Sequence, residues 1–297
     1  MNSSAPQTLE TDSISAEESN ALWPLCCPLD GAPLQRSGAH CHCSNGHTFD
    51  FAREGYLNLL SVQNKRSRDP GDSKEMVVAR RQFLNAGYYS VIADAIASVV
   101  ARESANRTSF TCLDAGCGEG YYLRALARHT PHLASSSFIG LDISKWAVQA
   151  AAKQWREARW VVASNARIPV MSNSLDCVLC VFGFPVFPEF ARALKPEGAV
   201  ILVDPGPEHL QQLREIIYPT VRRPREERRA IPEGFTLEST ATLKDTCELP
   251  SSEAIHWLLT MTPHLFRASA QGKSALCAMS ALTVDIDISV RVLRRVA

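Results

Sequence analysis

Strand-like and helix-like patterns of apolar residues alternate along the second two thirds of the chain. From residue 85 onward, short apolar runs of strand length are followed by stretches with helical spacing. A helix is expected over residues 88–103, and the next apolar strand ends at Leu113. Strands that alternate with helices indicate a mostly parallel sheet with helices on both faces. We therefore expect an α/β fold for residues 85–297.

A glycine-rich turn follows the first of these strands. The segment FTCLDAGCGEGYYLRALARH joins the strand through Gly116, Gly118 and Gly120 to the next helix. Glycines can adopt positive φ and let a ligand approach the backbone, and the N-terminus of a helix offers unpaired N–H groups. The following strand, SFIGLDIS, ends at Asp142, where a carboxylate can accept hydrogen bonds from ribose hydroxyls. Two successive strand ends therefore indicate a site for an adenosine-type ligand.

Dinucleotide-binding and methyl-donor-binding folds share both features, and three segments favour the methyl donor. The turn begins with Asp114 in the order D-x-G-x-G, which resembles motif I of class I methyltransferases. The segment ASNARIPVMSNSLDCVLCVF gives a polar turn at Ser164 and Asn165, where adenine would lie, and then a buried fourth strand. LKPEGAVILV resembles the helix, Lys-Pro turn and fifth strand of the same family. An α/β domain with an empty cleft would not require all these landmarks in sequence.

Cysteine and histidine residues are concentrated near the N-terminus. Four of the ten cysteines and three of the eight histidines fall between residues 26 and 47, in CCPLDGAPLQRSGAHCHCSNGHTFD. Tetrahedral zinc takes four donors in closely spaced pairs, and this segment supplies two such pairs, Cys27 with Asp30 and Cys43 with His47. A module this short buries too little apolar surface to be stable alone, so a metal would supply the missing cross-link.

The fourth ligand stays open at this point, because structural zinc sites use mainly Cys and His. Four neighbouring side chains could replace Asp30, namely Cys26, Cys41, His40 and His42. Alternatively, the module could be held without metal by packing against the main domain.

Composition limits the other possibilities. With 297 residues and 45% hydrophobic content, the chain can bury one α/β core and still form a small accessory module. No apolar run approaches the roughly 20 residues of a membrane-spanning helix, and the first 20 residues lack a signal-peptide pattern. The other six cysteines are scattered, as is typical of a reducing compartment. We expect a cytoplasmic protein without membrane association.

Positive charge is balanced overall but clustered locally. The chain has 31 basic and 31 acidic residues, so its net charge gives no support for a nucleic-acid partner. Two basic runs, KRSRDPGDSKEMVVARR at residues 65–81 and RRPREERR at residues 222–229, fit contacts to phosphates. The alternative is that both are solvated helix faces and loops, the second half-neutralised by Glu226 and Glu227.

Longer segments resemble one particular family. CSNGHTFDFAREGYLNLL, KRSRDPGDSKEM and ARRQFLNAGYY, with GCGEGYY and PGPEHL further on, resemble the bacterial 23S rRNA guanine-N1 methyltransferases over nearly everything after residue 24. The resemblance implies a zinc module before a Rossmann-like class I methyltransferase domain, S-adenosylmethionine as donor, and a guanine in a hairpin loop of large-subunit ribosomal RNA as substrate. It also implies a homodimer with a shared RNA cleft.

On this resemblance the chain divides into four parts. These are a disordered tail (1–22), a zinc-ribbon-like RNA-recognition module (23–62), a basic linker (63–84) and the S-adenosylmethionine-dependent methyltransferase domain (85–297).

The resemblance also implies individual site residues. The zinc ligands fall on Cys27, Asp30, Cys43 and His47, with Asp30 in the place of a cysteine of the family. Donor contacts fall on Tyr89, Gly118, Glu119 and His209, and with the loop and strand-end residues the expected donor site comprises Tyr89, Asp114, Gly116, Gly118, Glu119, Asp142 and His209. No residue is assigned to remove the proton from guanine N1. The aromatics that could hold an unstacked base are Phe182, Phe184, Trp257 and Phe266.

Three functions are compatible with the sequence. The first is methylation of a guanine at N1 in 23S ribosomal RNA. The second is a small-molecule, quinone-type methyltransferase, which would share residues 110–203 but has no reason to carry residues 26–81. The third is a non-catalytic RNA-binding protein that holds the donor without using it.

Overall fold

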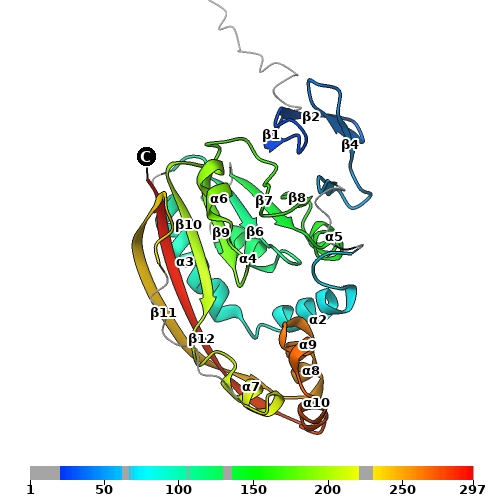
Figure 1. Cartoon of the computed structure of the whole chain (residues 1–297), viewed down its shortest axis with the longest axis vertical. Coiled ribbons are helices and arrows are strands. Elements are labelled where there is room, and N and C mark those ends of the chain that lie inside the picture. The colour runs from blue at the N-terminus through cyan, green and yellow to red at the C-terminus, as the bar shows by residue number, and fades with distance from the viewer. Residues whose placement is uncertain are drawn as a thin grey trace, which may run out of the picture.

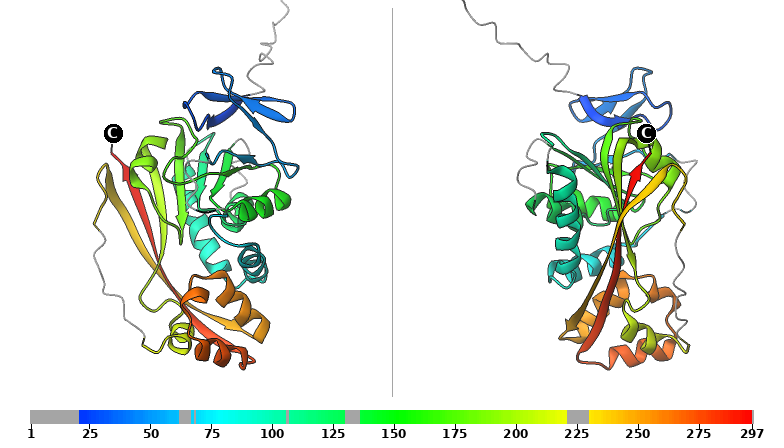
Figure 2. Two further views of the ribbon diagram at one scale, coloured as in Figure 1. Left: turned by 45° about the vertical axis from the view of Figure 1, so that its right-hand side comes forward. Right: turned by 90° about the vertical axis from the view of Figure 1, so that its left-hand side faces the viewer.

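The computed structural model describes residues 21–61, 67, 69–105, 107–129, 136–220 and 230–296. Its N-terminal part is a four-stranded antiparallel sheet in the order β1-β2-β3-β4, in which each strand pairs with the next along the chain. The strands are β1 (Ala21–Cys26), β2 (Pro33–Ser37), β3 (His40–His42) and β4 (Thr48–Asp50). Figures 1 and 2 show this N-terminal module at one end of the molecule.

The main sheet has eight strands in the order β11-β12-β10-β9-β6-β7-β8-β5. Neighbours from β5 to β10 run parallel, and β12 runs antiparallel to both β10 and β11. The strands are β5 (Leu57–Asn58), β6 (Thr111–Ala115), β7 (Ser137–Asp142), β8 (Arg159–Val162), β9 (Leu175–Val181), β10 (Leu194–Pro205), β11 (Phe235–Leu249) and β12 (Leu282–Arg295). Every residue of β9 is buried, as expected for a central strand covered on both faces. The predicted Rossmann-like α/β fold is confirmed.

Helices connect the strands, and those that follow β10 in the chain form a lobe at the end far from the N-terminal module (Figures 1 and 2). The helices are α2 (Lys74–Asn85), α3 (Ser90–Ser104), α4 (Tyr121–His129), α5 (Lys145–Gln154), α6 (Phe187–Ala193), α7 (Gln211–Ile217), α8 (Ser252–Met261), α9 (His264–Arg267) and α10 (Ala270–Cys277). Within the described residues, no single helix has the length and hydropathy to cross a membrane. Among these residues, only α2 and α3 taken together have the required length and hydropathy, and the two helices are bent by 80° relative to each other.

The two faces of the sheet are covered differently. Helices α3, α4, α5, α7 and α8 contribute to one hydrophobic core. On the other face the second core combines α6 with side chains of the N-terminal module, where Leu25 and Leu34 share a cluster with Ile139 and Val161 of the sheet. The module thus covers sheet surface that helices alone would leave to solvent, and its apolar side chains are buried without a core of their own.

Backbone hydrogen bonds fix the module in this place. The N–H of Cys26 donates to the carbonyl of Pro169 at 3.0 Å, and the N–H of Met171 donates to the carbonyl of Pro24 at 2.9 Å. β5, which was expected to belong to the module, pairs in parallel with β8 at the edge of the main sheet. β5 joins the main sheet because the parallel edge of β8 offers unpaired backbone groups that β5 satisfies, and the expected module boundary at residue 62 stays a prediction.

The boundaries expected for the tail and for the linker also stay predictions. Most of the expected tail, residues 1–20, lies outside the described residues, and β1 already begins at Ala21. The expected linker over residues 63–84 contains most of helix α2, which begins where Ser73 Oγ accepts from the N–H of Met76. Phe83 on this helix is fully buried, so packing against the core stabilises a helix where charge alone suggested a linker.

Candidate functional site

The glycine-rich loop between β6 and α4 has three glycines with positive φ, of 98° at Gly116, 55° at Gly118 and 81° at Gly120. A Cβ atom on Gly120 would lie 2.4 Å from the ring of Trp160, so close packing requires glycine there. A Cβ atom on Gly116 would meet no atom within 4 Å. The loop is therefore tightly packed on its protein side and open on the side where a ligand can approach.

Asp142, at the end of β7, is joined to this loop. One carboxylate oxygen accepts from the N–H of Gly118 at 2.9 Å, and the other accepts from the N–H of Ser144 at 2.8 Å. Burial raises the pKa of Asp142, and these two N–H bonds oppose the rise. Because each carboxylate oxygen can accept more than one hydrogen bond, both can still receive ribose hydroxyls.

Asn165, in the turn after β8, joins the ends of two other strands. Its Nδ2 donates to the carbonyl of Ala115 at 3.4 Å and to the carbonyl of Phe184 at 3.2 Å, and this fixes the orientation of the amide. Its Oδ1 is buried and has no hydrogen-bond partner among the described residues. An unpaired buried acceptor fits an amino group such as the exocyclic amine of adenine.

Asp114, at the end of β6, carries a second unpaired group. Both carboxylate oxygens are buried and lack a hydrogen-bond partner in the described part of the chain. Burial, and then repulsion by Asp142, raise the pKa of Asp114 to about 7. A cation such as the ammonium group of a methionyl moiety would satisfy this carboxylate. Asp142 and Asn165 thus fit the adenosine end of S-adenosylmethionine, and Asp114 fits its methionyl end. The open side of Gly116 leaves room for such a ligand.

Tyr89 and His209 meet on the other side of the loop. The hydroxyl oxygen of Tyr89 lies 3.4 Å from Nε2 of His209, and the ring of Phe182 stacks on His209 with a centroid distance of 5.5 Å. Burial lowers the pKa of His209 to about 4, and burial raises the pKa of Tyr89. Phe182 itself has a φ of 51°, an uncommon conformation for an aromatic residue that is typical of functional sites.

A cleft opens over the loop between these groups. Its lining comes from α2, the start of α3, the glycine-rich loop, the start of α4, the end of β9 and the end of α8, and comprises Arg80, Leu84, Tyr89, Gly116, Cys117, Gly118, Glu119, Tyr121, Tyr122, Val181, Phe182 and Met261. Four of the seven expected donor residues therefore line it. Of the other three, Asp142 is bonded to Gly118 and His209 is in contact with Tyr89, while Asp114 is buried at the strand end.

Glu119 differs from the other expected donor contacts. Its buried carboxylate forms an ion pair with Arg124 at 3.0 Å and accepts from Gln154. Glu119 lines the cleft, but its charged group is directed to protein partners. A contact with the donor would then involve its backbone.

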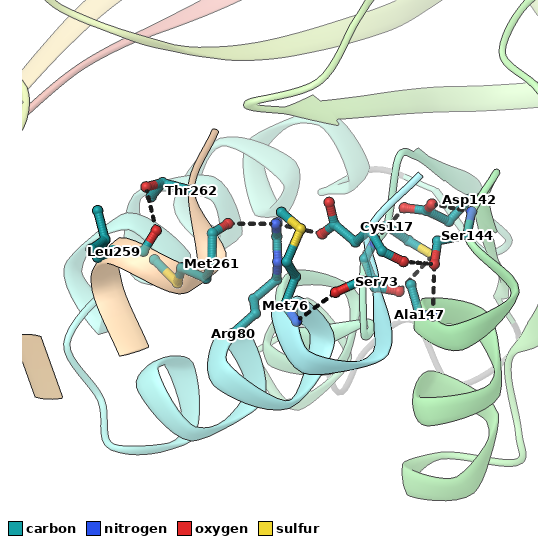
Figure 3. A network of polar contacts seen from close by, with 12 residues as sticks. Ser73, Met76, Arg80, Cys117, Asp142, Ser144, Ala147, Leu259, Met261 and Thr262 are labelled. Carbon is teal, nitrogen blue, oxygen red and sulfur yellow. Dashed lines mark hydrogen bonds and ion pairs between the residues drawn. The ribbon is translucent and has the colours of Figure 1, made fainter. Parts of the chain in front are cut away.

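Arg80 is a cleft residue that sequence reasoning missed. The sequence left two interpretations open for it and the other basic residues of 65–81, namely contact with RNA phosphates or a solvated helix face. In the structure its Nη2 lies 2.6 Å from a carboxylate oxygen of Asp72. The same nitrogen lies 2.8 Å from the carbonyl oxygen of Met261, and Figure 3 shows this contact between α2 and α8. Its spacing of three and four residues from buried Val77, Met76 and Leu84 is the signal that places it on the inward face of α2.

Most of the other basic residues in the two runs lie outside the described residues. These are Lys65, Arg66, Arg68 and the whole of 222–229.

The four expected metal ligands converge in the N-terminal module. Their ligand atoms all lie within 4.8 Å of one another. Nδ1 of His47 is 3.6 Å from Sγ of Cys27 and 3.5 Å from Sγ of Cys43, and Oδ2 of Asp30 is 3.5 Å from Sγ of Cys43. Around a tetrahedral zinc ion, a sulfur ligand lies about 3.6 Å from a neighbouring nitrogen or oxygen ligand. The donor set and its dimensions therefore fit a zinc ion.

Local structure orients these ligands. Oδ1 of Asp30 accepts from the N–H of Ala32 and Oδ2 accepts from Nδ2 of Asn45, both at 2.9 Å, and these bonds lower the pKa of Asp30. The proposed substitutes for Asp30 do not join the cluster in the described structure. Burial raises the pKa of both Cys26 and Cys41 to about 11, so both are thiols.

Comparison with known families gives two matches. Residues 25–68 match the family described as "RlmA, N-terminal", a zinc ribbon. Residues 112–198 match a methyltransferase domain family, and this range includes the glycine-rich loop and β6 to β9. The two matched segments correspond to the two parts of the molecule that converge on a common core.

Two relatives, both 34% identical to this chain, agree with these matches. YxjB of Bacillus subtilis, assigned as a 23S rRNA (guanine-N1)-methyltransferase, is 34% identical over 270 residues, which cover 88% of this chain and 94% of the relative. The 23S rRNA (guanine(748)-N1)-methyltransferase of Streptomyces fradiae is 34% identical over 195 residues, which cover 65% of this chain and 68% of that protein. A solved structure from Bacillus halodurans, assigned as a methyltransferase, superposes with a TM-score of 0.46 at 16% identity, over 68% of this chain and 99% of that one.

Proposed function

This chain belongs to the family of 23S rRNA (guanine-N1)-methyltransferases, and we propose that it transfers the methyl group of S-adenosylmethionine to N1 of a guanine in a hairpin loop of 23S ribosomal RNA. The observation that carries the proposal is the shared core of the zinc-ribbon module and the methyltransferase sheet. A small-molecule, quinone-type methyltransferase has no use for such a module. The proposal includes a cytoplasmic location, where the RNA substrate is found.

The reaction is an in-line displacement, for which the bound donor supplies an electrophilic methyl group. The chain's own residues must position donor and acceptor and exclude water. We assign the ribose to Asp142, the adenine amine to Oδ1 of Asn165 and the methionyl ammonium to Asp114, because each of these groups has free acceptor capacity at a strand end. The open side of Gly116 leaves room for the donor over the loop.

The acceptor base needs a surface on which to stack after it leaves the RNA loop. Of the four aromatic candidates, Phe182 and Trp257 are half-buried, whereas Phe184 and Phe266 are 88% and 73% exposed. Phe184 comes three residues after the end of β9, and its carbonyl is held by the same Asn165 amide that contacts Ala115. We therefore assign Phe184 as the stacking surface for the target guanine.

We also propose that the module carries one structural zinc ion on Cys27, Asp30, Cys43 and His47. Zinc would cross-link the two turns that contain Gly31 and Gly46 and so hold the module in shape.

A homodimer with a shared RNA cleft, which the resemblance implies, completes the proposal. Light scattering of the purified protein would measure its mass directly.

Methyl transfer from labelled S-adenosylmethionine tests the function. The purified chain is incubated with naked or partly assembled large-subunit RNA and, separately, with a metabolite extract. Label in the RNA, with a reverse-transcription stop at one hairpin guanine, is the expected result. Label in metabolites alone would instead support the quinone-type alternative, and donor binding without transfer to either would indicate a non-catalytic RNA-binding protein.

A further inference from the structure

Arg80 has unused hydrogen-bonding capacity inside the donor cleft. Its Nη2 serves both Asp72 and the carbonyl of Met261, but its Nε is buried and has no hydrogen-bond partner among the described residues. A buried N–H without an acceptor is unfavourable and therefore uncommon. Arg80 is thus equipped to bind one more group.

The position of the side chain restricts what that group is. Cδ of Arg80 would lie 3.6 Å, and Nη1 3.9 Å, from a Cβ atom built on Gly118, so the guanidinium lies over the glycine-rich loop. The positive charge of Arg80 also acts on Asp142 and on the buried hydroxyls of Tyr89 and Tyr122. These neighbours belong to the donor half of the cleft rather than to the outer surface.

The chemistry of the guanidinium selects an oxyanion. Its N–H groups form strong charge-assisted hydrogen bonds with carboxylate oxygens. Asp72 is the one carboxylate in ion-pair contact with Arg80 among the described residues, and it contacts Nη2 alone. Both hydrogens of Nη2 are thus in use, and Nε is the nitrogen that is left without an acceptor among the described residues.

We propose that Arg80 binds the α-carboxylate of the methyl donor, on the opposite side of the methionyl group from Asp114. The inference rests on the proposed function, because it takes S-adenosylmethionine as the ligand. Arg80 then distinguishes ligands with a complete methionyl group from those that have lost the carboxylate. It also links the donor to α8, because the same side chain contacts the carbonyl of Met261.

Two ligands that differ in one group test the inference without any RNA. S-Adenosylmethionine and decarboxylated S-adenosylmethionine are titrated into the full chain by calorimetry. In Arg80→Gln, affinity for S-adenosylmethionine should fall by about ten- to a hundredfold, as for a charge-assisted hydrogen bond, while affinity for the decarboxylated ligand should change by less than about threefold. Because a misfolded cleft would lose both ligands, the second ligand controls for folding.

Two further variants complete the test. Arg81→Gln changes the neighbouring arginine, which does not line the cleft, and should leave both affinities unchanged. Arg80→Lys keeps the charge and should restore part of the preference for the carboxylate. Equal weakening of both ligands in Arg80→Gln and Arg80→Lys would assign Arg80 a structural role and overturn the inference. Loss of RNA affinity alone would also overturn it and indicate a phosphate contact, whereas a wild-type chain that binds neither ligand would refute the proposed function itself.

Discussion

Nε2 of His209 faces the hydroxyl group of Tyr89 at 3.4 Å, and His209 is the hydrogen-bond donor of this pair. The assignment follows from the other ring nitrogen, Nδ1, which accepts from the backbone N–H of Asp287 at 3.3 Å and so carries no hydrogen. Burial lowers the pKa of His209 to about 4, so at neutral pH the ring is uncharged and its one hydrogen is on Nε2. The hydroxyl hydrogen of Tyr89 therefore remains free to donate to a ligand in the cleft.

Replacing Tyr89 by Phe should therefore weaken donor binding. Loss of one hydrogen bond of about 1 kcal/mol lowers the affinity for S-adenosylmethionine about fivefold, as measured by calorimetric titration. The variant should also be less stable by about 1–3 kcal/mol in chemical denaturation, because Nε2–H of His209 loses its acceptor. Tyr88→Phe is the matched control, since Tyr88 is half-buried and packs on Phe83 outside the cleft lining. Equal affinity losses in the two variants would contradict the assignment.

Asp114 should make the stability of the donor-free protein depend on pH. Its pKa is raised to about 7 from an ordinary value of 3.8, so between these values the folded chain holds a proton that the unfolded chain has released. The contribution of Asp114 to stability is complete below about pH 4 and is lost as pH rises through 7. Denaturation at pH 5, 6, 7 and 8 should show this loss in the wild type and a flatter profile in Asp114→Asn. Parallel pH profiles of stability in the wild type and Asp114→Asn would be evidence against a raised pKa of Asp114.

Donor binding should release the proton that Asp114 holds. An ammonium group beside the carboxylate favours its ionised form, so donor affinity increases with pH up to about 7 and then levels off. Calorimetry in two buffers of different ionisation enthalpy measures the proton directly at pH 6. Asp114→Asn should release none. Equal proton release in both proteins would assign the proton to another group.

The glycines of the loop should respond differently to alanine. Gly116→Ala places a methyl group in the open space of the loop, so the chain should fold at a cost of about 1–2 kcal/mol for positive φ, while donor affinity falls more than about tenfold. Gly55→Ala is the matched control, because Gly55 has a φ of 95° and equally open surroundings away from the cleft. It should lose stability to a similar extent but keep donor affinity. Gly120→Ala should instead destabilise the fold itself, because its methyl group would clash with the ring of Trp160.

Removal of a zinc ligand should be separable from removal of a buried thiol. Cys43 and Cys41 are 2% and 0% exposed, so serine at either position places a hydroxyl group in a comparably buried environment. Elemental analysis should find about one zinc per chain in the wild type and in Cys41→Ser, and little in Cys43→Ser or Asp30→Ala. Zinc retained by Cys43→Ser would show that the ligand set is different.

Replacing Phe184 should impair methylation of RNA without weakening donor binding. Base stacking on an aromatic side chain contributes about 1–3 kcal/mol, so Phe184→Ala should lower kcat/KM for RNA about tenfold or more. Affinity for S-adenosylmethionine should stay within about twofold of the wild type. Phe266→Ala, at the other exposed phenylalanine among the four aromatic candidates, shows whether loss of any surface aromatic has the same effect. An unchanged kcat/KM for Phe184→Ala would remove Phe184 from the acceptor site.

The sequence predicts the glycine-rich loop and its relation to Asp142 because both are local. Each lies directly after a strand, and parallel neighbouring strands bring their carboxyl ends together at one edge of the sheet. The bond from Gly118 to Asp142 spans 24 residues of the chain. The four residues of the metal cluster are likewise within one short segment, so their spacing alone brings them to two neighbouring turns.

Contacts between distant segments could not be predicted in the same way. The pairing of β5 with β8 involves Leu57 and Val161, and nothing in a two-residue strand specifies which sheet edge it joins. Arg80 is in a basic run whose composition suggests RNA, and its actual neighbour, Met261, is in a different part of the chain. Phe182 has a positive φ and is half-buried, whereas Phe184 is exposed, and the sequence indicates neither property.

The hydrogen bond between Arg80 and Met261 joins residues that are 181 positions apart. During translation, Arg80 leaves the ribosome long before Met261 is synthesised, so the nascent chain carries the glycine-rich loop without the α8 side of its cleft. Strand β12, which pairs with β10 in the middle of the sheet, is made later still. The cleft over the glycine-rich loop, which Met261 helps to line, is therefore completed only after α8 has been synthesised.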